Sequence, residues 1–363
     1  MIQNLKNSIQ FSSIIPIIAS ILLATSCKPP QLVEDELPSN ISGAFIVLNE
    51  GLFQHNNSSL TWFHWHTQQN VSEMFEKKNA IGMGDTGNDL AIYGNKIYIL
   101  MNNSHIVHVL DRKTGKLQTQ ISLAENGIGA SPRNMTFHHG KVYVSAFNDF
   151  LYKIDTTTFG IEGKIQLGKN PDQMLLVENE LWVSNSGGLV PEGDSTISVV
   201  DLLSFSEINR VTIGRNPGAM TTDGVYIYGV SRGNYVDIPS RLVKINKANK
   251  VVEKNEEIPL SSVRVFNNKL YASGYYFESN SSSVTEIDKV SFEALSENLI
   301  NHLSIQTLYG FQQLEVLGQE IFAFLDAKQF IHQGKVIITD HTFQPIFEFS
   351  AGLNPTKIIF NAP

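Results

Sequence analysis

The residue types that most often carry out catalysis are present in this chain, but their spacing forms no known catalytic motif. The 363 residues include ten scattered histidines and one cysteine, Cys27. His138 and His139 fall in a predicted turn, and His64 and His66 fall in one predicted strand, so no histidine and carboxylate cluster has the spacing of a metal site. The chain also lacks GxSxG, Walker and HExxH patterns. The sequence therefore predicts a protein that is not an enzyme, with no cofactor and no metal.

Composition and charge exclude further classes of protein. Hydrophobic residues make up 42% of the chain, which is enough for a sizeable core and excludes disorder over most of its length. Lys and Arg number 27 against 35 Asp and Glu, the formal net charge is −8, and no long basic run is present. We therefore expect no nucleic-acid partner. A single cysteine also excludes a disulfide framework within one chain.

The lone cysteine follows a short apolar segment near the N-terminus. An apolar run from Ile14 to Ala24 is followed by two small residues and then by Cys27. The run is too short to cross a membrane core of about 30 Å, which takes about 20 helical residues. It is typical of a cleavable signal over residues 1–26. The pattern resembles a bacterial lipobox, which predicts acylation of Cys27; an ordinary secretory signal with an unrelated cysteine is the alternative.

A segment rich in proline and acidic residues follows the cysteine. The composition of residues 27–42 is typical of a flexible, solvated tether. Its acidic triplet, Glu34, Asp35 and Glu36, resembles the export signal by which Bacteroidetes lipoproteins reach the outer face of the outer membrane. A plain spacer is the alternative. Together with an acylated cysteine, this signal predicts a lipid-anchored outer-membrane protein that is exposed at the cell surface.

From Gly43 to Pro363 the chain repeats one pattern, which must be recognised before any local prediction. Each copy holds a strand-like apolar run and then a second run that ends in Asp or a polar substitute before a turn. The seven strand-ending residues are His64, Asp111, Asp155, Asp201, Asn246, Asp288 and Asp340. Period-two alternation of β-branched and aromatic residues predicts strands. Units of about 46 residues with four strands are typical of propeller blades.

The two ends of this repeat region are complementary. The C-terminal NPTKIIF is a first strand without its second, and the N-terminal AFIVLNEG is a second strand without its first. Their pairing would complete one blade and remove the exposed edges of the ring. We therefore predict an all-β fold over residues 43–363: a seven-bladed β-propeller of four-stranded blades, closed by pairing of the N- and C-terminal strands.

Two sets of repeated residues are predicted to be structural. The strand-ending aspartates can accept hydrogen bonds from backbone N–H groups of the turns that follow them. The large aromatic residues in the preceding strands are expected to pack between blades rather than to stack on a ligand; these are Tyr98, Tyr143, Trp182 and Tyr271.

The loops between blades, and the loops between the second and third strands of each blade, meet at one rim of a propeller. On this rim the sequence places an amide-rich, aromatic and nearly charge-balanced set, which suits a large uncharged or amphipathic ligand. The predicted ligand-binding residues are Asn49, Glu50, Asp85, Asn88, Arg133, Asn134, Phe147, Asp172, Asn185, Arg232, Tyr235, Tyr275, Tyr276 and Gln312.

Three of the loops on this rim are longer than a hairpin needs, namely 186–196, 231–240 and 274–283. Long loops on a rigid scaffold often carry binding function. Neutral variation in loop length is the alternative.

Three segments carry a resemblance to a known family: LNEGLFQHNNSSL, MGDTGNDLAIYGNKIYILMNNSHIVHVLDRKTGKL and SPRNMTFHHGKVYVSAFNDFLYKIDTTTFGIEGKIQLGKNPDQM. They are similar to the YncE-like surface propellers of Bacteroidetes lipoproteins, and the similarity extends over essentially the whole mature domain. One branch of that family, the BtuG-type proteins, captures cobalamin on the top face and passes it to an outer-membrane transporter. The resemblance thus implies a corrinoid or another amphipathic small molecule as ligand and a TonB-dependent transporter as partner.

The shared motifs mostly form blades, so they do not by themselves carry corrinoid binding to this chain. Two alternatives stay open. Related seven-bladed folds place Glu, Asp, Asn and Arg around a central metal, which would make the protein a lactonase-like metal-dependent hydrolase. The other alternative is a propeller that only docks a protein.

Overall fold

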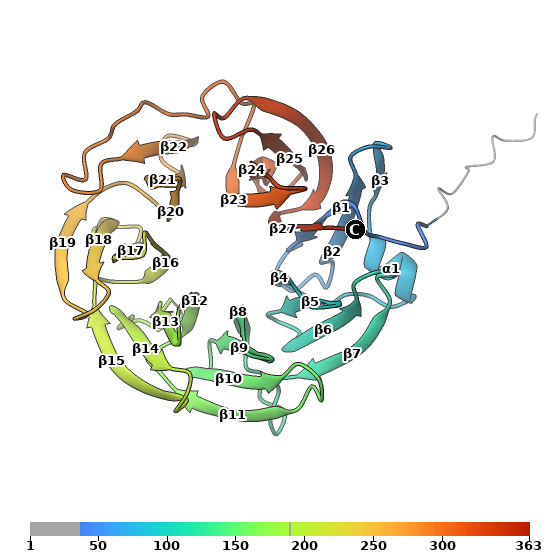
Figure 1. Ribbon diagram of the computed structural model, residues 1–363, viewed down its shortest axis with the longest axis horizontal. Coiled ribbons are helices and arrows are strands. Elements are labelled where there is room, and N and C mark those ends of the chain that lie inside the picture. The colour runs from blue at the N-terminus through green and yellow to red at the C-terminus, as the bar shows by residue number, and fades with distance from the viewer. Residues whose placement is uncertain (1–36, 189) are drawn as a thin grey trace, which may run out of the picture. The chain divides into compact units, whose positions relative to one another are not determined.

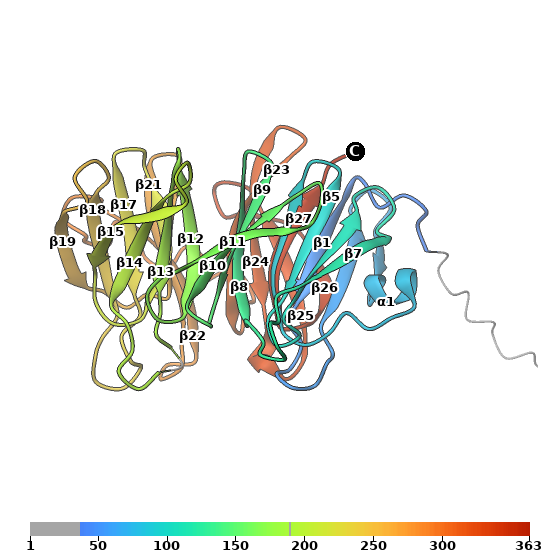
Figure 2. The same ribbon diagram turned by 90° about the horizontal axis from the view of Figure 1, so that it is seen from below.

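The computed structural model describes residues 37–188 and 190–363, whose strands close into a ring (Figure 1). Seven antiparallel sheets stand around a central axis, and the strands run roughly along that axis (Figure 2). The predicted all-β, seven-bladed propeller is confirmed. The signal segment, Cys27 and the acidic triplet lie outside the described residues. None of the helices in the described ranges is long and apolar enough to span a membrane.

Each blade begins with its strand on the channel and proceeds outward. Blade I consists of β27 (Pro355–Asn361), β1 (Ala44–Asn49), β2 (Ser59–His64) and β3 (Gln69–Val71). Blade II consists of β4 (Gly87–Tyr93), β5 (Lys96–Met101), β6 (Ile106–Asp111) and β7 (Leu117–Ser122). Blade III consists of β8 (Pro132–His138), β9 (Lys141–Ala146), β10 (Phe150–Asp155) and β11 (Ile161–Gln166). Blade IV consists of β12 (Pro171–Val177), β13 (Glu180–Asn185), β14 (Thr196–Asp201) and β15 (Ser206–Thr212).

The remaining three blades follow the same order. Blade V consists of β16 (Pro217–Thr222), β17 (Tyr226–Ser231), β18 (Arg241–Asn246) and β19 (Val252–Glu257). Blade VI has β20 (Ser262–Phe266), β21 (Lys269–Tyr276) and β22 (Ser281–Ile287). Blade VII consists of β23 (Leu308–Val316), β24 (Gln319–Asp326), β25 (Gln333–Thr339) and β26 (Pro345–Leu353). The helix α1 (Met74–Asn79) lies outside the ring, and the short 3₁₀ helix η1 (Lys328–Phe330) precedes β25.

Pairing between the two ends of the repeat region closes the ring, as predicted. Strand β1 pairs antiparallel with β27, with Ile46 opposite Ile359 and Val47 opposite Ile358. The backbone N–H of Gly43 also donates to the carbonyl of Asn361 at 2.6 Å. Because β1 and β27 pair with each other in one sheet, the edges at which they meet have no unpaired backbone groups exposed as an open sheet edge.

Large side chains of the second strands fill the space between blades. Tyr98, Tyr143, Trp182 and Tyr271 are all almost completely buried. Tyr98 of β5, for example, belongs to one apolar cluster with Val144 of the next blade. Neighbouring blades therefore cover both faces of these strands, which confirms the predicted packing role. Burial also raises the pKa of the Tyr98 hydroxyl to about 12.

The strand-ending aspartates fix the turns that follow them. Asp111 accepts the N–H of Thr114 at 2.8 Å, and Asp288 accepts the N–H of Ser291 at 2.6 Å. The Lys141 ammonium and two backbone N–H groups of the turn hold the pKa of Asp155 well below its usual range. The structural role predicted for these residues is confirmed, at the rim where the C-terminus also lies.

Blade VI departs from the regular pattern because its fourth position holds an irregular segment. The sheet has three strands, and Leu295 and Leu299 donate single backbone hydrogen bonds to β22 carbonyls at 2.8 Å each. Between them, the Ser296 hydroxyl accepts the N–H of Glu286 at 2.9 Å and the Asn298 amide oxygen accepts the N–H of Val284 at 3.1 Å. Side chains thus replace part of a strand ladder.

Two further segments differ from what the sequence suggested. The predicted long loop 274–283 is mostly hairpin: Gly274 pairs with Ser283 and Tyr276 with Ser281, so that prediction is wrong and a turn of residues 277–280 remains. The described part of the predicted tether, residues 37–42, contacts the propeller. There Ile41 is buried, and its carbonyl accepts the indole N–H of Trp62 at 3.1 Å.

Candidate functional site

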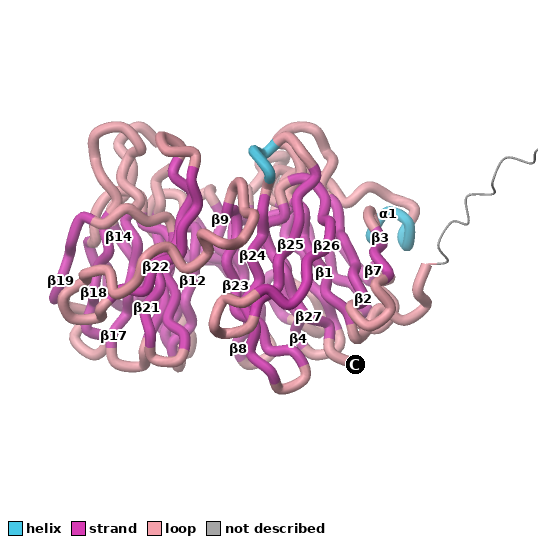
Figure 3. The backbone as a smooth tube through the Cα atoms, turned by 90° about the horizontal axis from the view of Figure 1, so that it is seen from above, coloured by secondary structure: helices cyan, strands magenta, loops and turns pink. Residues whose placement is uncertain are grey.

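Figure 3 shows η1 together with loops at one rim of the propeller. A cavity of about 980 Å³ opens at this rim. Its walls come mainly from blades V, VI and VII, and its floor comes from strands that line the channel. We call it the rim cavity. Small-molecule sites commonly measure about 300–1,000 Å³, so this cavity is large enough for a sizeable ligand.

Four aromatic side chains form one wall of the rim cavity, and we call them the aromatic wall: Tyr275, Phe277, Tyr309 and Phe330. The rings of Phe277 and Phe330 are stacked with centroids 6.2 Å apart, and Tyr275 meets Phe277 edge-on at 4.8 Å. Tyr309 meets Phe330 edge-on at 5.5 Å. The side chain of Phe277 is nevertheless 71% exposed. The rings hold one another in place while leaving aromatic surface in contact with solvent.

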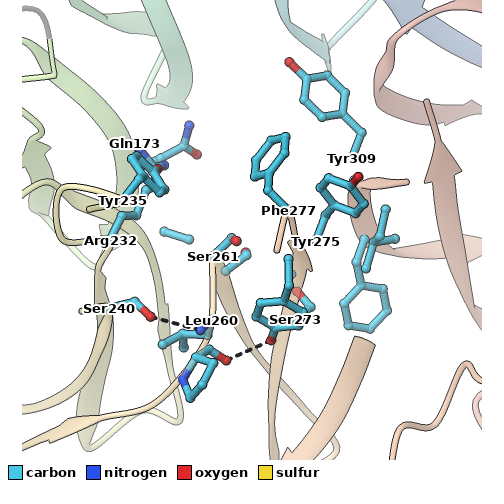
Figure 4. A pocket seen from close by; sticks show the side chains of 18 of the residues that line it. Gln173, Arg232, Tyr235, Ser240, Leu260, Ser261, Ser273, Tyr275, Phe277 and Tyr309 are labelled. Atoms are coloured by element: carbon cyan, nitrogen blue, oxygen red, sulfur yellow. Dashed lines mark hydrogen bonds between the residues drawn. The ribbon is translucent and has the colours of Figure 1, made fainter. Parts of the chain in front are cut away.

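The loop of residues 232–240 forms the facing wall, and Figure 4 shows Arg232 and Tyr235 across the cavity from Tyr275 and Phe277. Tyr235 is 73% exposed. One side chain shapes the loop: the amide oxygen of Asn234 accepts three consecutive backbone N–H groups, that of Ile238 at 2.8 Å. Gly233 has φ +70°, and a Cβ there would lie 1.9 Å from the carbonyl oxygen of Ile238, so the turn requires glycine.

The floor is polar and continues into a second, narrower space of about 270 Å³, which we call the channel cavity. Asn134, Gln173, Arg264 and Lys357 line both cavities. Asn134 is already engaged, since its amide donates to Asp89 at 2.9 Å and accepts the N–H of Met174 at 3.2 Å. The floor therefore contains both groups that bind neighbouring strands together and groups that face the open space.

Seven of the predicted ligand-binding residues line the rim cavity: Asn88, Asn134, Arg232, Tyr235, Tyr275, Tyr276 and Gln312. Gln312 also joins two blades, because its amide accepts the N–H of Ile358 at 2.8 Å and donates to the carbonyl of the same residue at 3.3 Å. The structure thus brings half of the predicted set into one space, and their contact with a ligand stays a prediction.

Three other predicted residues form a charged network beside the cavity. Asp172 pairs with Arg133 at 3.3 Å and with Arg232 at 3.2 Å. Burial raises the pKa of Asp172, but the two guanidinium groups outweigh burial and hold the pKa below its usual range. The Arg133 guanidinium also lies over the ring of Phe147, 4.5 Å from its centroid. The ion pairs and the cation–π contact therefore join blades III, IV and V and give each charged group a partner within the protein.

Glu50 lies behind the aromatic wall and acts on it through one hydrogen bond. The Tyr309 hydroxyl donates to the Glu50 carboxylate. Burial raises the pKa of Glu50, and the hydrogen bond from Tyr309 offsets only part of that effect. The pKa of Tyr309 is raised as well, by its own burial and by the nearby carboxylate. Glu50 therefore positions an aromatic residue of the cavity without lining it.

The last three predicted residues lie at strand ends and have partners within the protein. Asn49 and Asn185 are fully buried. The Asn49 amide donates to Thr61 at 3.0 Å, and the Asn185 amide donates to Ser198 at 2.9 Å. Asp85 accepts the amide of Asn103 at 3.0 Å. A role for these three in binding a ligand stays a prediction without support from the cavity lining.

Sequence reasoning missed Tyr309, Phe330 and Arg264. A signal for Arg264 was present, because its place in the repeat is otherwise uncharged. It pairs across the sheet with Tyr271, the inter-blade aromatic of blade VI. The six equivalent residues, each opposite the corresponding position in its blade, are Ala91, Thr136, Leu175, Thr221, Gln313 and Ile359.

No metal site is apparent in the parts of the chain that the structure describes. Within residues 37–188 and 190–363, no three His, Cys, Asp or Glu side chains are grouped so that they could hold a metal ion. The carboxylates nearest the mouth of the channel, Glu50, Asp85 and Asp172, each accept hydrogen bonds from protein donors.

Comparison with known proteins gives one family and several similar folds. A family model described as "Domain of unknown function (DUF5074)" matches residues 42–191. No curated protein matches the chain.

Three solved structures show the same kind of fold at low sequence identity. A quinonprotein alcohol dehydrogenase-like protein from Bacteroides thetaiotaomicron has a TM-score of 0.60 and 14% identity, over 89% of this chain and 79% of that chain. Kuenenia stuttgartiensis hydrazine synthase has a TM-score of 0.54 and 16% identity, over 68% and 74%. Dihydro-heme d1 dehydrogenase NirN in complex with DHE has a TM-score of 0.59 and 11% identity, over 90% and 77%.

Identities this low show the fold alone and carry no activity to this chain. Residues 42–191 match the DUF5074 model, and the part of the chain that the structure describes folds as a seven-bladed β-propeller, an architecture consistent with docking a ligand or a protein.

Proposed function

We propose that the protein is a cell-surface binding protein that holds an amphipathic small molecule in the rim cavity without transforming it. The observation that carries this proposal is the aromatic wall, which faces Tyr235 across an open space of about 980 Å³. Exposed aromatic surface that is held rigidly in a cavity offers contact area at little entropic cost. Polar groups on the floor would orient the ligand.

The wall and the floor favour a ligand with a flat conjugated or ring-rich face and polar edges. Phe277 offers a ring face to solvent, while the Tyr235 hydroxyl and the Arg232 guanidinium on the facing loop can contact polar substituents. Arg232 keeps Asp172 as a partner, but a purely apolar ligand would cover the Tyr235 hydroxyl without a hydrogen bond, which costs about 1–3 kcal/mol for a buried polar group. An amphipathic ligand satisfies both walls.

A corrinoid is the first candidate, and a TonB-dependent outer-membrane transporter is the partner that would receive it. This part of the proposal is supported by the resemblance to YncE-like lipoproteins with their BtuG-type branch, and by the predicted acylation of Cys27. A corrinoid macrocycle is large and bears amide-containing side chains, which suits an aromatic wall next to amide-rich strands. The hydrolase alternative has weaker support, because the carboxylates at the mouth are engaged with Tyr309, Asn103 and two arginines.

Calorimetric titration of the folded domain with cyanocobalamin tests the ligand. We expect binding by the wild type and at least tenfold weaker binding by Phe277→Ala, because interface aromatics of this kind often contribute more than 1.4 kcal/mol. Phe53→Ala is the matched control, since Phe53 is also exposed, at 61%, in the loop between β1 and β2 but does not line the cavity. It should bind like the wild type.

The outcomes separate the parts of the proposal. Absence of binding would reject the corrinoid, and equal weakening by both variants would reject the rim cavity as its site.

The anchor is tested by metabolic labelling with a palmitate analogue, which should label the wild type and not Cys27→Ser. The transporter is tested by co-purification from native membranes, where the absence of a TonB-dependent protein would contradict that partner.

A further inference from the structure

Arg264 places a cation on the floor between the rim cavity and the channel cavity. It lines both spaces. At the same place in the repeat, the other six blades carry uncharged residues, among them Thr136 and Thr221. Blade packing therefore does not require an arginine here, and the charge of Arg264 calls for a separate explanation.

The hydrogen bonds of Arg264 leave most of its donors available. One terminal nitrogen donates to the backbone carbonyl of Phe311 at 3.0 Å, and the guanidinium carbon lies 5.8 Å from the centre of the Phe311 ring. No carboxylate among the described residues pairs with it, whereas Arg133 and Arg232 in the same region share Asp172. A guanidinium carries five N–H donors in a planar fork that fits a carboxylate or a phosphate.

The channel cavity offers Arg264 no compensating negative charge, and the two acidic residues that line the rim cavity, Asp237 and Glu278, are exposed and make no ion pair with it. The channel cavity is lined by Arg264 and Lys357 and by no acidic side chain. Lys357 pairs with Asp89 at 3.0 Å, so Arg264 is the cation in this lining without an acidic partner. Burial without such a partner lowers the pKa of the guanidinium. Arginine nevertheless remains protonated in proteins, so the floor keeps a positive charge.

We propose that the floor of the rim cavity is an anion site in which Arg264 binds a carboxylate or a phosphate group of the ligand. This rests on the proposed function, because it assigns the polar end of the molecule whose ring system the aromatic wall would hold. Lys357 and Gln173, which line the same floor, would add further donors. The ligand class is thereby narrowed to ring-containing molecules that carry an anionic group.

Three probes that share one ring system test the charge of the ligand. 2-Naphthoate and 2-naphthyl phosphate each carry an anion, and 2-naphthamide is the neutral counterpart. Titrations followed by saturation-transfer NMR should show both anions binding the wild type at least tenfold more tightly than the amide. The stronger of the two anions then identifies carboxylate or phosphate as the preferred group. Raising the salt concentration should weaken the anions and leave the amide unchanged.

Two variants of Arg264 and one matched control assign the effect to this side chain. Arg264→Gln should bind the anions and the amide equally, and Arg264→Lys should keep part of the preference because it keeps the charge. Arg210→Gln removes a charge from the outer strand β15, where Arg210 pairs with Glu207 at 2.7 Å. This control should keep the full preference. If Arg264→Gln keeps it too, the assignment to Arg264 is wrong.

Thermal unfolding distinguishes a binding role from a structural one. If Arg264 serves a ligand, Arg264→Met should unfold at the same or a higher temperature, because a partly buried cation without an acidic partner is costly. Inorganic phosphate at matched ionic strength should stabilise the wild type and not this variant. A Tm lower by several degrees would assign Arg264 a structural role and overturn the proposal.

The titrations also separate this inference from the proposed function. Equal binding of all three probes by the wild type would overturn the anion site and leave the aromatic cavity as proposed. Binding of none of the probes would contradict both. Loss of amide binding in Phe277→Ala, with the amide unaffected by Arg264→Gln, would support the division of the site into an aromatic wall and an anionic floor.

Discussion

The rim of the propeller has two halves that use the same residue types differently. On blades II–IV, which we call the closed half, the charged and amide groups bind one another or the adjoining blade: Asp172 pairs with Arg133 and with Arg232 of blade V, and Asp85 accepts the amide of Asn103. On blades V–VII aromatic groups such as Phe277 stay exposed. The family match covers residues 42–191 and so ends within blade IV. It includes only three lining residues of the rim cavity, Asn88, Asn134 and Gln173.

Because the cavity lies mainly outside the matched segment, similarity of fold says little about the ligand. The matched residues 42–191 consist mainly of strands, their turns and residues that join blades, such as Asn134, which donates to Asp89 at 2.9 Å. The walls of the rim cavity come instead from the loop of residues 232–240, the β21–β22 hairpin and residues between Leu308 and Phe330. Function resides in a site that the fold supports rather than in the fold itself.

Removing the Asp172 carboxylate, which Arg133 and Arg232 share, should have the largest effect on stability. Asp172→Ala leaves Arg133 and Arg232 without their acidic partner in a largely buried place, where the Asp172 side chain is 2% exposed. We expect a loss of about 3 kcal/mol in the free energy of unfolding, measured by urea denaturation.

The matched change in the other half is Asp237→Ala. Asp237 is an exposed residue of the rim cavity that accepts a hydrogen bond from Asn234 at 2.6 Å. We expect a loss below about 0.5 kcal/mol, as for surface substitutions. Similar losses for the two variants would contradict the distinction between the closed half, whose charged groups pair with one another, and the exposed half on blades V–VII.

The sequence was sufficient for the fold because the repeat carries its own signals. The strand-ending residues recur at steps close to one blade, and the incomplete segments at the two ends can only be completed by pairing with each other. In blade VI, where side chains replace part of the backbone strand ladder, the repeat pattern does not reveal the strands. Asn298 and Ser296 hold the fourth position of blade VI, and the serines of 281–283 give no apolar alternation to reveal that β22 begins there.

The candidate site could be predicted only in part, for a physical reason. Spacing places Asn49 and Tyr275 on the same rim, but it does not say which side chain an inter-blade hydrogen bond will use. Asn49 is held by Thr61 and Ser59, whereas the ring of Tyr275 faces the cavity. Arg264 lies within a strand, and the rule that rim loops carry the binding residues does not reach a side chain that enters the cavity from a strand.

The irregular fourth position of blade VI should be sensitive to a single amide. The Asn298 oxygen accepts the N–H of Val284 at 3.1 Å, and its nitrogen donates to the carbonyl of Ser282 at 2.9 Å. Asn298→Ala should cost about 1–2 kcal/mol, because it leaves a strand N–H and a carbonyl without partners. Hydrogen exchange should show faster exchange at Val284.

Asn209→Ala in β15 is the control for that change, because Asn209 belongs to a regular fourth strand whose backbone makes the ladder. We expect little change in stability from it. Equal costs for Asn209→Ala and Asn298→Ala would mean that the Asn298 side chain does not substitute for a strand in blade VI.

The smallest effect concerns pH and a histidine in the closed half. His108 is fully buried, and one ring nitrogen lies 2.6 Å from the carbonyl of Met83. Burial lowers its pKa, and the hydrogen bond to the carbonyl offsets only part of that shift. Because the folded pKa lies below the unfolded value of about 6.5, the unfolded state binds more protons between the two values. The contribution of His108 to stability is therefore complete above about pH 6.5 and declines as the pH falls below it.

His108→Gln should remove this part of the decline, so that the difference in Tm between the variant and the wild type changes from pH 7.5 to pH 5.5. His139→Gln, at an exposed turn, should follow the wild type at both values. A constant difference for His108→Gln would show that the buried imidazole does not contribute to the pH dependence of the closed half.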